Sequence, residues 1–165
     1  MSNVESIGSL YRPPIFSVDA REKDMAHGKS IKADSYKLLS RRLNRFPQGA
    51  PSSDLLFQIL KVLFSEREAG LVSLLPIKPF TGKRAAVIWR METGETAKVL
   101  DGLAERGLLL DYVENGEKTY ILPPPMAGFF EFSLMHYRND IDQKALSELF
   151  YQYMNVEEDF IKCLF

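Results

Sequence analysis

The pattern of hydrophobic and polar positions between residues 81 and 123 predicts two short helices followed by a β-hairpin. Thr81 is placed to cap a helix over residues 82–90, and Thr93 to cap a second helix that runs to Arg106. Each predicted helix carries apolar residues at helical spacing. On the first they are Ala85, Ala86, Ile88 and Trp89, and on the second Ala97, Leu100, Leu103 and Ala104.

The second predicted helix is followed by signals of a helix end and a hairpin. Gly107 stands where a left-handed residue commonly ends a helix. Asn115-Gly116 predicts a tight turn between strands at 108–113 and 118–122, because both residues tolerate positive φ. The prolines at 123–125 end the pairing. This order predicts a winged helix-turn-helix; a small α+β piece without a recognition role is the alternative.

Three further helices are predicted upstream, over residues 35–45, 54–64 and 66–75. Asp34 and Ser53 are placed to cap the first two. Ser65 and Glu68 have the spacing of a capping box for the third. The helix at 35–45 is the only basic one, and one face carries Lys37, Arg41, Arg42 and Arg45. That face is either solvated or a surface for nucleic acid or an acidic partner.

Downstream of the prolines the chain is rich in aromatic residues and predicts two more helices. Asp140 begins one over about 141–153, and Asn155 caps a last one that ends at Leu164. The expected fold is therefore mainly α with a small β-hairpin, a winged helix-turn-helix with extra N- and C-terminal helices.

The predicted elements divide the chain into three regions. Residues 1–33 are expected to be a flexible N-terminal arm, and 34–123 a helical scaffold plus winged helix-turn-helix with its core at 53–123. Residues 124–165 form an aromatic-rich helical extension, which we expect to lead to a downstream domain. Its apolar surface must be covered. The candidate interface residues are Leu149, Phe150, Tyr153 and Phe160.

The charge of the predicted winged helix disfavours DNA reading. Residues 53–123 hold nine Lys/Arg and ten Asp/Glu, a net of −1, whereas phosphate binding needs positive charge. In the predicted recognition helix, Lys98 and Arg106 are outnumbered by acidic residues, and the wing tip carries Glu114 and Glu117. The nucleic-acid contacts that remain as candidates are Arg84, Arg90, Lys98 and Lys118.

The sequence assigns no catalytic, cofactor-binding or metal-binding residue. Its single cysteine, Cys163, excludes an internal disulfide and any multi-cysteine metal site within these 165 residues. His27 and His136 lie in no metal-binding or nucleophile motif. Trp89 is expected in the core; a small-molecule pocket among Trp89, Phe129, Phe130 and Phe132 is the alternative. Without a secretory signal or a run of ~20 apolar residues, a cytoplasmic protein with no membrane contact is expected.

Several stretches between residues 35 and 165 resemble the N-terminal region of bacterial and archaeal 4Fe–4S ferredoxin-type proteins. They are SYKLLSRRL (35–43), ILKVLFSEREA (59–69), LLP (74–76), RGLL (106–109), PPMAGFFEF (124–132), DIDQK (140–144) and LFYQY (149–153). The resemblance implies a winged-helix-like region placed before a cysteine-rich segment that carries the clusters. This chain lacks that segment, so no ligand is assigned, and [4Fe–4S] clusters are expected downstream of Phe165.

Two functions follow as expectations. The first is a non-catalytic docking module of an electron-transfer protein, whose partner is its own downstream iron–sulfur domain or a redox protein, with a homodimer as a further arrangement. The second is a dimeric DNA-binding transcriptional regulator of the winged-helix class.

Overall fold

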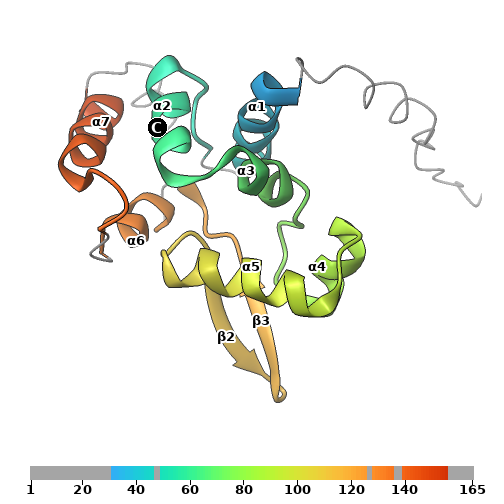
Figure 1. The fold of residues 1–165 in the computed structure, drawn as a ribbon. Coiled ribbons are helices and arrows are strands. Elements are labelled where there is room, and N and C mark those ends of the chain that lie inside the picture. Colours follow the sequence, from blue (N-terminus) through green and yellow to red (C-terminus); the bar gives the residue numbers. More distant parts are fainter. Residues whose placement is uncertain (1–30, 47–48, 126–127, 136–138, 156–165) are drawn as a thin grey trace, which may run out of the picture. The chain divides into compact units, whose positions relative to one another are not determined.

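The computed structural model describes residues 31–46, 49–125, 128–135 and 139–155 (Figure 1). In these ranges it is a mainly helical domain with a small antiparallel sheet. Its seven helices are α1 (Ile31–Leu43), α2 (Asp54–Leu63), α3 (Glu66–Ser73), α4 (Gly82–Trp89), α5 (Thr93–Glu105), α6 (Phe129–Met135) and α7 (Gln143–Asn155). Its three strands are β1 (Phe80–Thr81), β2 (Leu110–Glu114) and β3 (Glu117–Ile121).

Side-chain caps fix the starts of three helices, as the sequence predicts. The Ser53 hydroxyl accepts a bond from the Leu56 N–H at 3.1 Å, and the Thr81 hydroxyl accepts one from the Arg84 N–H at 3.4 Å. Ser65 and Glu68 form a reciprocal capping box at the start of α3. Each cap satisfies an N–H group that has no partner within its own helix.

Three predicted caps are wrong. The helix α1 begins at Ile31, so Asp34 lies inside it, and the expected boundary between arm and scaffold falls within this helix. At α5, Glu92 is the N-cap, with extended backbone and no side-chain cap, and Thr93 is already helical. Before α7, the Ala145 N–H donates to Asp142 at 3.0 Å, so Asp142 replaces the predicted Asp140. In each case the backbone turns into the helix at another residue.

The sheet has the strand order β1-β3-β2, and all pairs are antiparallel. The predicted turn is confirmed, since Asn115 and Gly116 have φ of 52° and 79° and lie between the paired Glu114 and Glu117. β2 starts two residues later than predicted because Leu108 and Leu109 are buried in the core. β1, which pairs Phe80 with Tyr120, was not predicted.

One hydrophobic core joins the helices to the sheet. α1 packs against α3 and α2, and α7 packs against α2 and α6. The ring of Phe130 on α6 lies 4.8 Å from that of Phe150 and 5.9 Å from that of Tyr153, both on α7. The Tyr153 hydroxyl donates to the Pro51 carbonyl at 2.8 Å, which fixes α7 beside the segment before α2.

The predicted elements differ from the observed ones in two further places. α3 ends at Ser73 rather than at residue 75, and α6 was not predicted as a helix. Asn155 is the last residue of α7, and the expected final helix and the N-terminal arm lie outside the described residues. None of the helices in the described ranges combines the length and apolar content that a membrane span requires.

Candidate interaction surfaces

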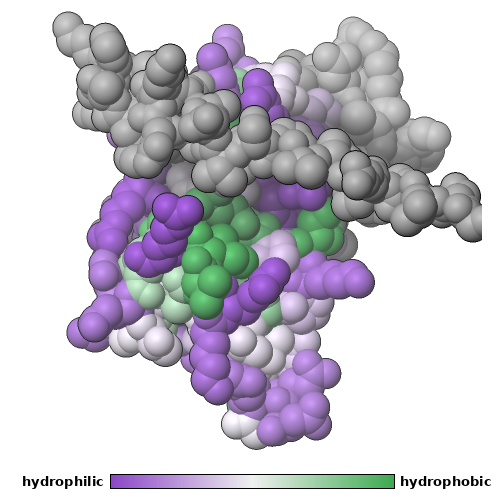
Figure 2. All heavy atoms as spheres, turned by 90° about the vertical axis from the view of Figure 1, so that its right-hand side faces the viewer, coloured by the Kyte–Doolittle hydropathy of each residue, from purple (hydrophilic) through white to green (hydrophobic). Residues whose placement is uncertain are grey.

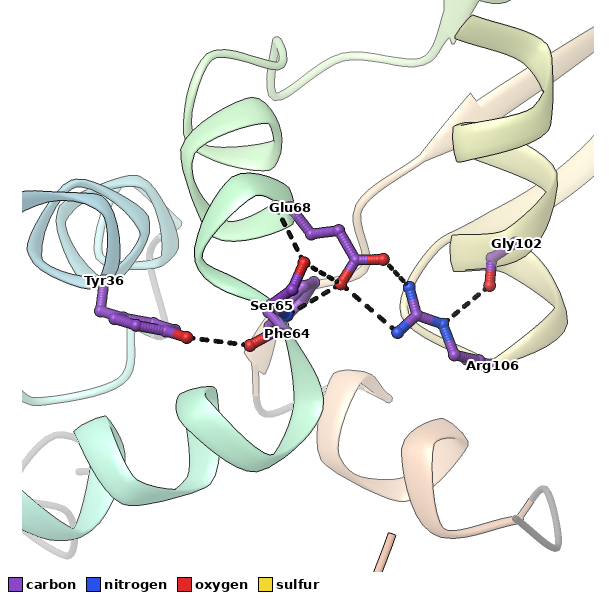
Figure 3. A network of polar contacts seen from close by, with 6 residues as sticks. All are labelled: Tyr36, Phe64, Ser65, Glu68, Gly102 and Arg106. Atoms are coloured by element: carbon purple, nitrogen blue, oxygen red, sulfur yellow. Dashed lines mark hydrogen bonds and ion pairs between the residues drawn. The ribbon is translucent and has the colours of Figure 1, made fainter. Parts of the chain in front are cut away.

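A polar network ties α3 to α5 and to α1 (Figure 3). Glu68 accepts hydrogen bonds from the Ser65 backbone N–H at 2.8 Å and from the Arg106 guanidinium, with which it forms an ion pair. Arg106 also donates from Nε to the Gly102 carbonyl at 2.9 Å. On the other side, the Tyr36 hydroxyl donates to the Phe64 carbonyl at 3.0 Å. The start of α3 is thereby fixed between its two neighbours.

A second network fixes the hairpin to α5. Lys118 of β3 lies between two carboxylates, with Nζ 2.8 Å from Asp101 of α5 and 2.9 Å from Asp111 of β2. The Tyr120 hydroxyl donates to the same Asp101 oxygen at 2.7 Å. Asp101, Asp111 and Lys118 line a hollow of about 370 Å³ together with Ala104 and Glu105.

The titration properties of this cluster follow from its contacts. Hydrogen bonds from Lys118 and Tyr120 lower the pKa of Asp101. Hydrogen bonds to Asp101 and Asp111 raise the pKa of Lys118, so its ammonium is held more firmly. Burial, together with the hydrogen bond to Asp101, raises the pKa of Tyr120 to about 12. Asp101 and Lys118 therefore stay charged near neutral pH, and their contact holds the hairpin against α5.

The four predicted nucleic-acid contacts fall into two groups. Arg84, Arg90 and Lys98 are exposed, and none of them has an ion-pair partner among the described residues. Lys118 instead is held by Asp101 and Asp111. The same neutralisation affects two neighbouring cations, because Arg67 pairs with Glu95 and Lys83 pairs with Glu117.

The predicted basic face of α1 is interrupted by Arg42. Lys37, Arg41 and Arg45 are exposed as expected, but Arg42 is only 2% exposed. Its Nε donates to the Leu75 carbonyl at 2.7 Å and its Nη2 to the Pro76 carbonyl at 2.6 Å, while Nη1 is buried without a hydrogen-bond partner. The prediction of a solvated Arg42 is wrong, since its guanidinium is buried and donates to the two carbonyls after α3.

Burial changes the titration of this guanidinium as well. Burial, with a smaller repulsion from Arg45, lowers the pKa of Arg42 to about 10. The group therefore remains cationic at neutral pH, and the two carbonyls after α3 are the polar groups that receive it. A cation near the carbonyl end of a helix is favoured by the helix dipole.

The predicted interface residues lie mostly in the chain's own core. Phe150 is 1% exposed and Tyr153 is 0% exposed, and both contact Phe130. Leu149 is partly buried against the same core. Phe160 lies outside the described residues. Within the described ranges, α6 and α2 cover the apolar face of α7.

The aromatic residues of the alternative pocket also pack within the domain. Trp89 is buried, as the core reading predicts, and its Nε1 donates to the Leu71 carbonyl at 2.8 Å. Phe130 packs on α7, and Phe132 is partly buried. The side chain of Phe129 lies outside the described set. Trp89 thus joins α4 to α3, while Phe130 joins α6 to α7.

α3 and α4 carry exposed apolar residues that were not predicted from the sequence. Val87 of α4 is 74% exposed and Leu74, at the end of α3, is 53% exposed. Leu71 of α3 and Ile88 of α4 are half-buried. We call Leu71, Leu74, Val87 and Ile88 the α3–α4 patch. Figure 2, which views the α4 side of the domain, shows hydrophobic residues gathered in the middle of this face with hydrophilic residues around them.

A signal of this patch was present in the sequence. Ala85 and Trp89 are buried and define the inward side of α4, and Val87 falls on the opposite side. Arg84 and Arg90 lie three residues before and after it, so a valine occupies the polar face of the helix. A lone exposed valine is ordinary; the exposure of Leu74, the C-cap residue of α3, needed the tertiary structure to be found.

Among the described residues, no group of three or more His, Cys, Asp or Glu side chains is arranged to hold a metal ion. Cys163, His27 and His136 lie outside these residues. A scan against protein-family models, a search of curated proteins and a search of solved structures each returned no match to this chain. The resemblance to ferredoxin-type proteins therefore stays a prediction.

Proposed function

We propose that this chain is a winged helix-turn-helix that serves as a docking module and carries out no chemistry itself. The order α4, turn, α5 and β2–β3 hairpin supports the winged-helix assignment, with β1 as the third strand. In this assignment α5 takes the place of the recognition helix and the hairpin that of the wing.

The observation that carries the docking role is the α3–α4 patch. Val87 and Leu74 present apolar side chains to solvent, and such a surface with a polar border is typical of a protein-binding site. The exposed Arg84 and Arg90 stand on either side of Val87 along α4. A partner that fits would therefore present apolar side chains flanked by carboxylates.

The charge of the α5–hairpin face supports docking over DNA reading. From Thr93 to Ile121 the chain holds three Lys/Arg and six Asp/Glu, a net of −3. Lys118, the cation nearest the wing tip, is already bound by Asp101 and Asp111. Moving it to a phosphate would leave both carboxylates without a cation beside the DNA, and their repulsion would oppose binding.

The cellular setting that we propose is the N-terminus of a 4Fe–4S ferredoxin-type electron-transfer protein. This part rests on the sequence resemblance alone, at 124–132 and 140–153 above all. The docking partner is then the downstream iron–sulfur domain or a redox protein that it meets.

To test the proposal, hydrogen–deuterium exchange is measured on the native gene product, purified without proteolytic cleavage, and on the 165-residue chain. We expect the native product to exceed 18.8 kDa, to contain iron, and to show slower exchange at residues 71–91 than the 165-residue chain does. Val87→Lys in the native product should abolish that added protection, because it places an ammonium in an apolar contact. Tyr112→Lys, at an exposed position on β2, is the matched control and should retain it.

The outcomes separate the two parts of the proposal. A mass equal to that of the 165-residue chain, without iron, contradicts the iron–sulfur setting. Iron with no added protection at 71–91 leaves that setting intact and contradicts docking through the patch.

DNA binding is the second candidate, favoured by the three exposed cations Arg84, Arg90 and Lys98. If it holds, duplex binding weakens steeply with salt, and neutralising these three residues removes it. Val87→Lys distinguishes the candidates, since an added cation strengthens or preserves duplex binding but disrupts an apolar dock. No salt-dependent binding to duplex by the 165-residue chain would exclude this candidate.

A further inference from the structure

β2 is an edge strand with an open side. The sheet order β1-β3-β2 places β3 on one side of it, and the described residues contribute no strand to the other (Figure 1). All five residues of β2 are exposed. They include three large hydrophobic side chains: Leu110 is 37% exposed, Tyr112 41% and Val113 72%. An open edge offers unpaired N–H and C=O groups to another strand.

The register of the hairpin determines which backbone groups face the open side. Glu114 and Glu117 flank the two-residue turn, and this closing pair is hydrogen-bonded in hairpins of this kind. Hydrogen-bonded and non-hydrogen-bonded pairs then alternate along an antiparallel ladder. The backbone groups of Asp111 and Val113 therefore point away from β3.

We propose that β2 pairs antiparallel with β2 of a second copy of this chain, about a two-fold axis that passes between the two Tyr112 residues. Tyr112 then faces the partner's Tyr112, Asp111 faces the partner's Val113, and Leu110 faces the partner's Glu114. The two sheets join into one six-stranded sheet, with α5 of each copy on the same side. This surface is separate from the α3–α4 patch, so the inference goes beyond the docking role and does not rest on it.

Charge and hydrogen bonding select this register. A continuous sheet with both α5 helices on one side requires the two-fold axis to pass between two copies of the same residue. An axis at Asp111 would place two carboxylates opposite each other, and an axis at Val113 would pair only three residues of the strand. With the axis at Tyr112, all five residues pair and no like charges face each other. The outward backbone groups of Asp111 and Val113 also meet, which gives a hydrogen-bonded pair on each side of the axis.

The side chains suit a self-complementary contact. Tyr112 forms an aromatic pair across the axis, and such cross-strand pairs stabilise a sheet. Asp111 keeps its bond to Lys118 of its own chain, so no charge loses its partner on pairing. With a single short strand at the contact, the dimer is weak and its population depends on concentration.

The test measures the mass of the full 165-residue chain by sedimentation equilibrium from low to high micromolar concentration. A reversible monomer–dimer equilibrium is expected. Tyr112→Lys and Tyr112→Glu should each raise the dimer dissociation constant about fivefold or more, because each places like charges on the axis. An equimolar mixture of the two variants should form a heterodimer at least as tight as the native dimer. Tyr151→Lys, at an exposed position on α7, is the matched control and should leave the constant unchanged.

A cross-linking measurement covers the case in which a charged residue unfolds the hairpin. Facing residues of a non-hydrogen-bonded pair have Cα atoms about 4.5 Å apart, within the ~4.4–6.8 Å range of disulfides. In a Cys163→Ser background, Tyr112→Cys should oxidise to a covalent dimer and Tyr151→Cys, at an exposed position on α7, should not. A single monomeric mass at every concentration overturns the proposal, and so does a dimer that is indifferent to Tyr112 in both measurements.

Discussion

Glu68 of α3 and Arg106 at the end of α5 form an ion pair between residues 38 positions apart in the sequence. The same carboxylate receives the Ser65 N–H and closes the capping box of α3 (Figure 3). One side chain therefore both starts a helix and fixes it to another. The sequence alone indicates the first of these roles, because capping is local, and not the second.

Replacing Glu68 by alanine should destabilise the domain by about 1–3 kcal/mol, since a cap and a partly buried charged hydrogen bond are lost together. Urea unfolding measures the change. Glu105→Ala, an exposed position on α5, is the control and should change the free energy of unfolding by less than about 0.5 kcal/mol. In a double-mutant cycle, Glu68→Gln and Arg106→Gln should not be additive; additive effects would mean that the ion pair contributes nothing to stability.

Arg42→Ala should cost about 2–4 kcal/mol, because it removes the donors to the Leu75 and Pro76 carbonyls and empties a buried site. Arg42→Lys should recover only part of this loss, since an ammonium cannot reproduce the planar fork of a guanidinium. Thermal unfolding with Arg41→Ala as the exposed neighbour is the measurement. Equal effects of the Arg41 and Arg42 variants would show that the inward contacts of Arg42 do not stabilise the fold.

Asp101→Asn should lower the pKa of Tyr120 from about 12 toward its ordinary value of 10.0, because the carboxylate that opposes tyrosinate is gone. A difference titration of tyrosinate absorbance against Tyr120→Phe isolates this residue. The native domain should also lose stability as pH rises between those two values. There the unfolded chain has released the proton of Tyr120 and the folded domain still holds it. A Tyr120 pKa that Asp101→Asn does not change would leave burial as the cause of the shift.

Two glycines with open space around them should respond in opposite directions to alanine. Gly102 lies inside α5, and the space that an added β-carbon would occupy is open, so Gly102→Ala should stabilise by about 0.5–1 kcal/mol through helix propensity. Gly116 is equally unobstructed but has φ of 79°, so Gly116→Ala should destabilise by about 1 kcal/mol through backbone strain. Chemical denaturation of both variants checks the sign, and a shared sign would contradict the reasoning.

The sequence predicts the elements whose signals are local. The caps at Ser53, Ser65 and Thr81 and the turn at Asn115-Gly116 are all observed, because each depends on contacts within four residues. β1 was missed because its two residues become a strand only by pairing with β3. Arg42 was misplaced for the same kind of reason, since its carbonyl partners lie more than thirty residues away.

The features of the candidate surfaces also divide into those that depend on local sequence and those that depend on tertiary contacts. Exposure of Arg84, Arg90 and Lys98 could be predicted from helical periodicity. The capture of Lys118 by Asp101 and Asp111 could not, because it depends on how the hairpin lies against α5.

The bonds of Lys118 and Tyr120 to Asp101 fix the hairpin to α5 before any partner arrives. A binding partner that touches both elements would therefore meet a surface already in its bound arrangement. It would not have to immobilise a swinging hairpin, and less of its interaction energy would be lost to conformational entropy.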